Sequence, residues 1–147
     1  MALLRTPLHD LCREGGGRMV PFAGWEMPVQ FSGLIQEHKA VRERMGMFDI
    51  SHMGVLRLEG PKPKDALQQL VPTDLHRIGP GEACYTVLLN DRGGIRDDLI
   101  VYDRGALDAD RGSLVLVINA ACTDNDTAWI RERMEPAGLT VTDSKAD

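Results

Sequence analysis

Two adjacent carboxylates, Asp97 and Asp98, begin an apolar run at 99–102. Alternation along a strand places Asp98 with Ile100 on one face and turns Leu99 to the other. A carboxylate in such a run costs free energy unless it is paired or hydrogen-bonded. Two interpretations of Asp98 are open: a solvated acid at a strand end, or a general base at a partly apolar site. Asp97 fits the solvated role better.

A hairpin-type sequence, Asn90-Asp-Arg-Gly-Gly, lies between this run and an earlier one that contains Tyr85. If residues 90–93 form a four-residue loop, Tyr85 faces Asp98 directly across the two strands. Residues that face each other across a ladder share a side of the sheet. The sequence therefore predicts a phenol beside a carboxylate.

Asn119 and Met53 are further candidates, each with a structural alternative. Asn119 closes the apolar run 114–119, where its amide is either a strand-end group bonded locally or a ligand contact. Met53 is either a core side chain or part of a ligand wall, because Met fills irregular gaps readily. The four histidines show no metal-ligand spacing, so we assign no metal, and the phosphate-loop and nucleophile-elbow motifs are absent.

The elements that must position these residues follow from periodicity. From residue 51 onward, period-two runs and helical runs alternate as strand 53–58, helix 65–70, strands 84–89, 98–102 and 114–119, a helix around 123–134 and strand 139–142. This β-α-β-β-β-α-β order predicts an α+β fold with a ferredoxin-like antiparallel sheet and helices on one face.

Residues 1–50 read as a separate, helical N-terminal segment. Thr6 is placed to cap a first helix, and Ser32 to cap a second. The stretch 19–31 holds two prolines and a glycine among aromatic residues, so we expect it to be irregular, without strands.

Composition excludes several functional classes. The 147 residues are 43% hydrophobic, enough for a core, and the formal charge of −5 argues against a nucleic-acid footprint. No apolar run has the roughly 20 residues of a membrane-spanning helix. The three cysteines are scattered and read as reduced thiols, so we expect a cytoplasmic protein.

Several strings resemble one family along nearly the whole chain: Arg5-Thr-Pro-Leu-His-Asp, Met19-Val-Pro-Phe-Ala-Gly-Trp-Glu-Met-Pro-Val-Gln-Phe, Gly46-Met-Phe-Asp-Ile-Ser-His-Met-Gly and Gly93-Gly-Ile-Arg-Asp-Asp-Leu-Ile-Val. These strings are similar to those of the T-proteins of the glycine cleavage system. The resemblance implies an aminomethyltransferase that acts with the lipoylated H-protein. The one-carbon unit of the aminomethyl-lipoyl arm passes to tetrahydrofolate, and ammonia is released.

The resemblance also implies roles for particular residues. Asp98 corresponds to the acid beside the reactive part of the folate, and Tyr85 to a residue of the same wall. Met53, Ile100 and Asn119 correspond to further folate contacts. Family members are longer, so residues 1–50 correspond to part of an incomplete first domain and residues 51–147 to a ferredoxin-like folate-binding domain.

Two other functions remain open at this point. One is a folate-binding or regulatory module without transferase activity. The other is the folate-dependent part of an enzyme of sarcosine or dimethylglycine oxidation, in which this module follows a flavin domain. The Arg-Thr-Pro-Leu string begins at Arg5, which fits a free-standing T-protein better than that fusion.

Overall fold

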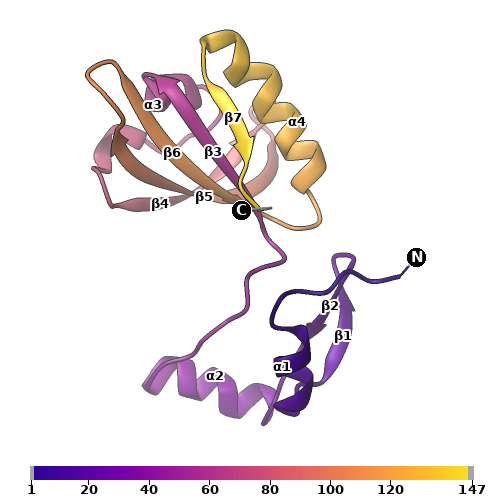
Figure 1. Ribbon diagram of the computed structural model, residues 1–147. Coiled ribbons are helices and arrows are strands. Elements are labelled where there is room, and N and C mark those ends of the chain that lie inside the picture. Colours follow the sequence, from indigo (N-terminus) through magenta and orange to yellow (C-terminus); the bar gives the residue numbers. More distant parts are fainter. Residues whose placement is uncertain (1, 146–147) are drawn as a thin grey trace. The chain divides into compact units, whose positions relative to one another are not determined.

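The computed structural model describes residues 2–145; Met1, Ala146 and Asp147, which the predicted ranges include, lie outside the described part. The chain divides into two compact units, Met1–His52 and Met53–Asp147 (Figure 1). Each unit is considered by itself below. No helix within residues 2–145 combines the length and the apolar character needed to cross a bilayer.

The second unit is built on one five-stranded antiparallel sheet. Its strands are β3 (Gly54–Pro61), β4 (Ala83–Leu89), β5 (Ile95–Ala106), β6 (Arg111–Ile118) and β7 (Thr140–Asp143). Its helices are α3 (Pro63–Leu67), α4 (Thr123–Met134) and the short 3₁₀ turns η1 (Leu75–Arg77) and η2 (Glu135–Ala137). The strands lie side by side in the order β4-β5-β6-β3-β7 (Figure 1). The α+β class and the β-α-β-β-β-α-β order are both confirmed.

One face of this sheet carries the hydrophobic core. Period-two alternation turns Leu56 of β3, Val101 of β5 and Leu116 of β6 to that face, and all three are fully buried. Leu67 of α3 and Ile130 of α4 cover them. Both helices therefore lie on the same face, and no helix among the described residues of the second unit covers the other face, which is called the open face below.

Helix α4 is held by a stripe of side chains four residues apart. Asp126, Ile130 and Met134 are its buried members, as expected for one side of a helix. The helix continues into η2 and ends at Gly138, which adopts a left-handed backbone with φ 83°. An acid thus occupies a position on the core-facing stripe.

The first unit contains α1 (His9–Glu14), β1 (Met19–Phe22), β2 (Trp25–Pro28) and α2 (Leu34–Glu43). The expectation of an irregular stretch without strands was wrong, because β1 and β2 form an antiparallel hairpin. Its two loop residues, Ala23 and Gly24, both have positive φ, as a tight hairpin turn requires. Proline is tolerated there because both strands of a two-stranded sheet are edge strands.

Both predicted helix caps were also wrong. Thr6 donates its hydroxyl to the Asp49 carboxylate at 2.6 Å, and the residue before α1 is Leu8. Ser32 does not cap α2; the Glu37 carboxylate instead accepts backbone N–H groups ahead of the helix, from Phe31 at 2.7 Å and from Gly33 at 2.8 Å. These hydrogen bonds to the charged form lower the pKa of Glu37.

Candidate functional site

The strand registers bring the predicted residues together on the open face. Asp98 of β5 lies opposite Val87 of β4. On its other side, Leu99 pairs with Ile118, so that Asp98 lies beside Asn119, which follows β6. Ile118 also pairs with Gly54, the first residue of β3. Met53, which precedes Gly54, therefore lies on the far side of Asn119. Asp98, Asn119 and Met53 thus form one row across neighbouring segments.

The next row on the same face is apolar and aromatic. Tyr85 of β4 pairs with Ile100 of β5, Ile100 pairs with Val117 of β6, and Val117 pairs with Val55 of β3. Ile100, Val117 and Val55 are half-buried, and Tyr85 is 67% exposed. The two rows together make a shallow apolar platform with a carboxylate, an amide and a phenol beside it.

The predicted register between β4 and β5 was wrong by two residues. Tyr85 pairs with Ile100 and not with Asp98, because the loop extends to Gly94 and a bulge lies at Leu88/Leu89. The Asn90 side chain stabilises this longer loop by accepting the backbone N–H of Gly94 at 3.0 Å. A shift of two residues preserves the face, so Tyr85 and Asp98 still share a side of the sheet.

A hydrogen bond links the Tyr85 hydroxyl to this acid. The interaction with the Asp98 carboxylate is the largest cause that raises the pKa of Tyr85, followed by burial. The phenol therefore donates to Asp98 and stays protonated at neutral pH. The two side chains form a unit that presents an acceptor, the carboxylate, beside the platform.

Asn119 connects the strand ends. Its amide nitrogen donates to the Asp97 carboxylate at 2.9 Å, and to the Asp98 carboxylate and carbonyl at 3.2 Å each. The backbone carbonyl of Asn119 accepts the Thr123 hydroxyl at 3.0 Å, and this hydrogen bond fixes Asn119 to the start of α4. The locally bonded strand-end interpretation of Asn119 therefore describes real contacts, and these contacts also hold it beside Asp98.

The interpretation of Asp97 as a solvated acid was wrong. One of its carboxylate oxygens is buried without a hydrogen-bond partner, in a cluster with Cys122 and Asp126 whose ligand atoms all lie within 4.8 Å of one another. The cause is the turn between β6 and α4, which brings Asp126 of α4 against the start of β5. Sequence reasoning missed Asp126, although its four-residue spacing from Ile130 on an otherwise apolar stripe was a usable signal.

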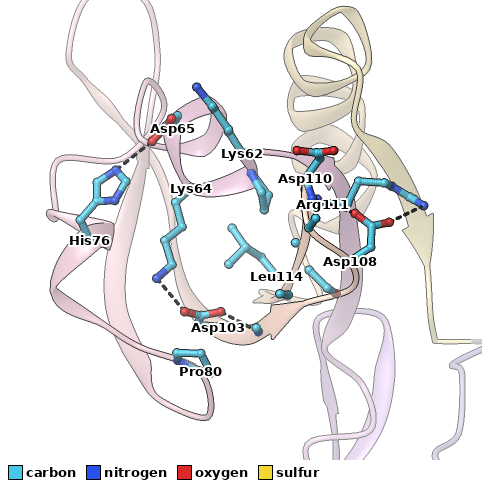
Figure 2. A pocket seen from close by; sticks show the side chains of 16 residues that line it. Lys62, Lys64, Asp65, His76, Pro80, Asp103, Asp108, Asp110, Arg111 and Leu114 are labelled. Atoms are coloured by element: carbon cyan, nitrogen blue, oxygen red, sulfur yellow. Dashed lines mark hydrogen bonds and ion pairs between the residues drawn. The ribbon is translucent and has the colours of Figure 1, made fainter.

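A separate depression of about 440 Å³ lies near α3 and the loop between β5 and β6 (Figure 2). Several of its polar side chains contact one another. Lys64 is ion-paired with Asp103 at 2.6 Å and His76 with Asp65 at 3.0 Å, as the dashed lines show. We interpret it as a structural ion-pair cluster, since Lys64 and His76 each contact an acid and none of the predicted site residues lines it.

The arrangement on the open face defines a class of chemistry. A carboxylate beside a half-buried apolar surface can accept a proton from a bound amine, or stabilise a cationic carbon. The apolar row can take the flat face of a ring, and the amide and phenol provide the few polar groups that orient a small ligand. This geometry suits a small ligand with a flat ring, held beside an acid.

Comparison with known proteins identifies the family. Residues 8–147 match the model of the GCVT N-terminal domain, and the chain belongs to this family. An aminomethyltransferase of Parasynechococcus marenigrum (strain WH8102) is 85% identical over 146 residues, which cover 99% of this chain and 40% of that protein. One of Prochlorococcus marinus (strain NATL1A) is 59% identical over 143 residues, covering 97% and 38%.

A solved structure agrees with these sequences. The crystal structure of glycine cleavage system aminomethyltransferase T from Bartonella henselae superposes with a TM-score of 0.83 at 35% identity, over 97% of this chain and 38% of that one. The chain spans about 40% of the length of the curated relatives that it matches. It corresponds to the N-terminal part of these proteins.

Proposed function

We propose that this chain is the folate-binding part of an aminomethyltransferase of the glycine cleavage system. The longer protein transfers a one-carbon unit from aminomethyl-lipoyl H-protein to tetrahydrofolate and releases ammonia. The observation that carries the proposal is the gathering of Asp98, Tyr85, Ile100, Asn119 and Met53 on the open face of the sheet, around a half-buried apolar row.

The chemistry of this face suits that reaction. Attack by the folate nitrogens on the aminomethyl carbon displaces both ammonia and the dihydrolipoyl sulfur, so a proton must leave a folate nitrogen while positive charge develops on the carbon. Asp98 is the group that can accept the proton or stabilise the charge. Tyr85 and Asn119 both donate hydrogen bonds to Asp98, which orient its carboxylate.

The partners and the compartment belong to the same proposal. The lipoylated H-protein supplies the aminomethyl group, and tetrahydrofolate is the co-substrate. We place the protein in the cytoplasm, because Cys12, Cys84 and Cys122 are unpaired thiols, the form that reducing compartments maintain. Neither nucleic acid nor a membrane is expected as a partner.

A chimera tests the proposal. Residues 1–147 would replace the matching region of the Parasynechococcus marenigrum aminomethyltransferase, which is 85% identical to this chain. Aminomethyl-lipoyl H-protein and tetrahydrofolate are supplied, and methylenetetrahydrofolate and ammonia are measured. Turnover near that of the unaltered relative supports the proposal. Folate binding without turnover would instead indicate a non-catalytic module.

A further inference from the structure

Asp126 is an acid in a position where an acid is costly. It is 2% exposed, and its Oδ2 atom has no hydrogen-bond partner. The Oδ2 atom of Asp97, on β5, is also buried and unpartnered. The two carboxyl groups lie within 4.8 Å of each other, together with the thiol of Cys122. Two buried acceptors therefore lie close together, and the donor shown beside them is the Cys122 thiol.

A single proton resolves this arrangement. Two ionised carboxylates at this separation repel, and burial of an oxygen of each raises the cost of the charge. If one carboxyl group is protonated, its O–H donates to the other, and both unpartnered oxygens are satisfied at once. Burial, followed by the hydrogen bond and the charge of Asp97, raises the pKa of Asp126 to about 7, against the opposing effect of Arg96.

We propose that Asp97 and Asp126 share one proton near neutral pH, and that this acid pair is a positioning device for Asn119 and, through it, for Asp98. The link to Asp98 rests on the proposed function, whereas the shared proton does not. With its Oδ2 bonded to Asp126, Asp97 presents Oδ1 to the Asn119 amide at 2.9 Å. The same amide nitrogen contacts Asp98 at 3.2 Å.

The surrounding charges favour a proton over a metal ion. Burial raises the pKa of the Cys122 thiol, and the nearby carboxylates raise it further, so the thiolate that a metal would need is disfavoured. Arg96 of β5, the cation that acts on the pKa of Asp126, is stacked on Trp129 of α4, 4.2 Å from the ring centre. On the other strands that contact α4, the charged residues are Arg57 and Glu59 of β3 and Asp143 of β7.

Nuclear magnetic resonance of the isotope-labelled chain tests the pair without any folate. The side-chain carboxyl carbon of Asp126 and the side-chain amide of Asn119 should titrate together, with a midpoint near 7. In Asp126→Asn, the new amide donates permanently to Asp97, so the Asn119 resonances should stay at their low-pH positions. Asp97→Asn should remove the titration as well, so the shared proton can still be tested if Asp126→Asn folds poorly. Asp124→Asn, at an exposed position of the same helix, should leave it unchanged.

Three results would overturn the inference. The first is an Asn119 amide that does not move between about pH 5 and pH 9. The second is a shift of the same resonances by zinc ions at neutral pH, which would indicate a cation site. The third result concerns positioning. In an active chimera, Asp126→Asn should move the alkaline limb of the kcat–pH profile to higher pH. A profile that does not move would show that the pair has a structural role only. Failure of the chimera to turn over at all would contradict the proposed function and leave the resonance data standing on their own.

Discussion

Asp98 contributes through its charge in the proposed reaction, and Asp98→Asn separates charge from shape. Asn is nearly isosteric and keeps an acceptor oxygen, but it cannot take a proton from the folate nitrogen or neutralise a developing cation. General-base and electrostatic contributions are each typically worth about 10²-fold. In the active chimera, the rate of methylenetetrahydrofolate formation should fall by about 10²-fold or more, while folate affinity changes little.

The choice of control for this experiment depends on the structure. Asp97 is adjacent in sequence and turned to the other face, but it contacts Asn119 and the Asp126 cluster, so its replacement would disturb the site. Asp110 is an exposed acid in the loop between β5 and β6, and Asp110→Asn should keep full activity. Retention of activity by Asp98→Asn would exclude this carboxylate from the chemistry.

Tyr85 provides a direct measure of its contact with Asp98. The carboxylate raises the pKa of the phenol by accepting its hydrogen bond. Asp98→Asn should therefore lower the pKa of Tyr85, since the neutral amide favours the protonated phenol less. The chain has two tyrosines, and a Tyr102→Phe background leaves Tyr85 as the phenol whose ultraviolet absorbance reports ionisation. An unchanged titration would mean that the two side chains do not interact in solution.

Asp126 also couples stability to pH, and the sign follows from its raised pKa. The folded chain retains a proton that the unfolded chain releases above its ordinary value of about 4. The free energy of unfolding should thus be highest below about pH 4 with respect to this group. It should decrease toward pH 7, by at most about 1.4 kcal/mol per pH unit. Urea denaturation of the chain and of Asp126→Asn, compared across pH, isolates this contribution; parallel curves would contradict it.

At the level of residues, alternation predicted more than loop length did. The side of the sheet on which Tyr85, Asp98 and Ile100 lie follows from period two, and a register error of two residues did not change it. The register itself depended on how Asn90 closes its loop, which loop length alone does not specify. The contact between Asp97 and Asp126 could not be predicted, because it depends on how α4 folds back against the sheet.

At the level of elements, the start of β3 depends on the absence of a side chain at Gly54. A Cβ there would lie 2.7 Å from the Ile118 side chain and 2.9 Å from the Thr123 hydroxyl, closer than real contacts allow. Gly54→Ala should destabilise the second unit by about 1–3 kcal/mol, the usual cost of overpacking. It should also disturb Asn119, whose carbonyl accepts the Thr123 hydroxyl. Urea denaturation followed by circular dichroism measures the change.

Gly79→Ala is the matched control for this substitution. A Cβ at Gly79 would have its nearest neighbour, Glu82, at 3.6 Å, an ordinary contact, and its φ lies outside the left-handed region. Its stability should change by less than about 0.5 kcal/mol, as is usual for such surface positions. Equal effects of the two substitutions would show that close packing at Gly54 is not the cause.

The elements that were predicted correctly have strong periodicity and a core to face. β3, β5 and β6 carry apolar side chains on one face, and their order along the chain followed from the sequence. The hairpin of β1 and β2 was missed because its prolines argue against a central strand, whereas a two-stranded sheet has edges only. The cap of α2 was missed because Glu37 reaches back from within the helix to the backbone ahead of it, and the cap of α1 because Thr6 donates to Asp49 instead.

At the level of the whole molecule, the chain alone should bind folate weakly. The platform of the second unit is shallow and open on the side away from the helices, and a small ligand held on one side loses buried area and orienting groups. Calorimetric titration of the chain with a reduced folate should show little heat, whereas the chimera should bind at micromolar concentration or better, about −8 kcal/mol. Micromolar binding by the chain itself would show that its platform is a complete site.

The place of β3 in the sheet has a consequence for how the protein is made. Gly54 pairs with Ile118, and Leu56 pairs with Asp143, so β3 lacks both neighbouring strands until the ribosome has synthesised the chain as far as these residues. At typical synthesis rates this delay is roughly ten seconds. During it, the apolar side chains of β3 are exposed on the nascent chain, which makes this segment a natural target for chaperones that act at the ribosome.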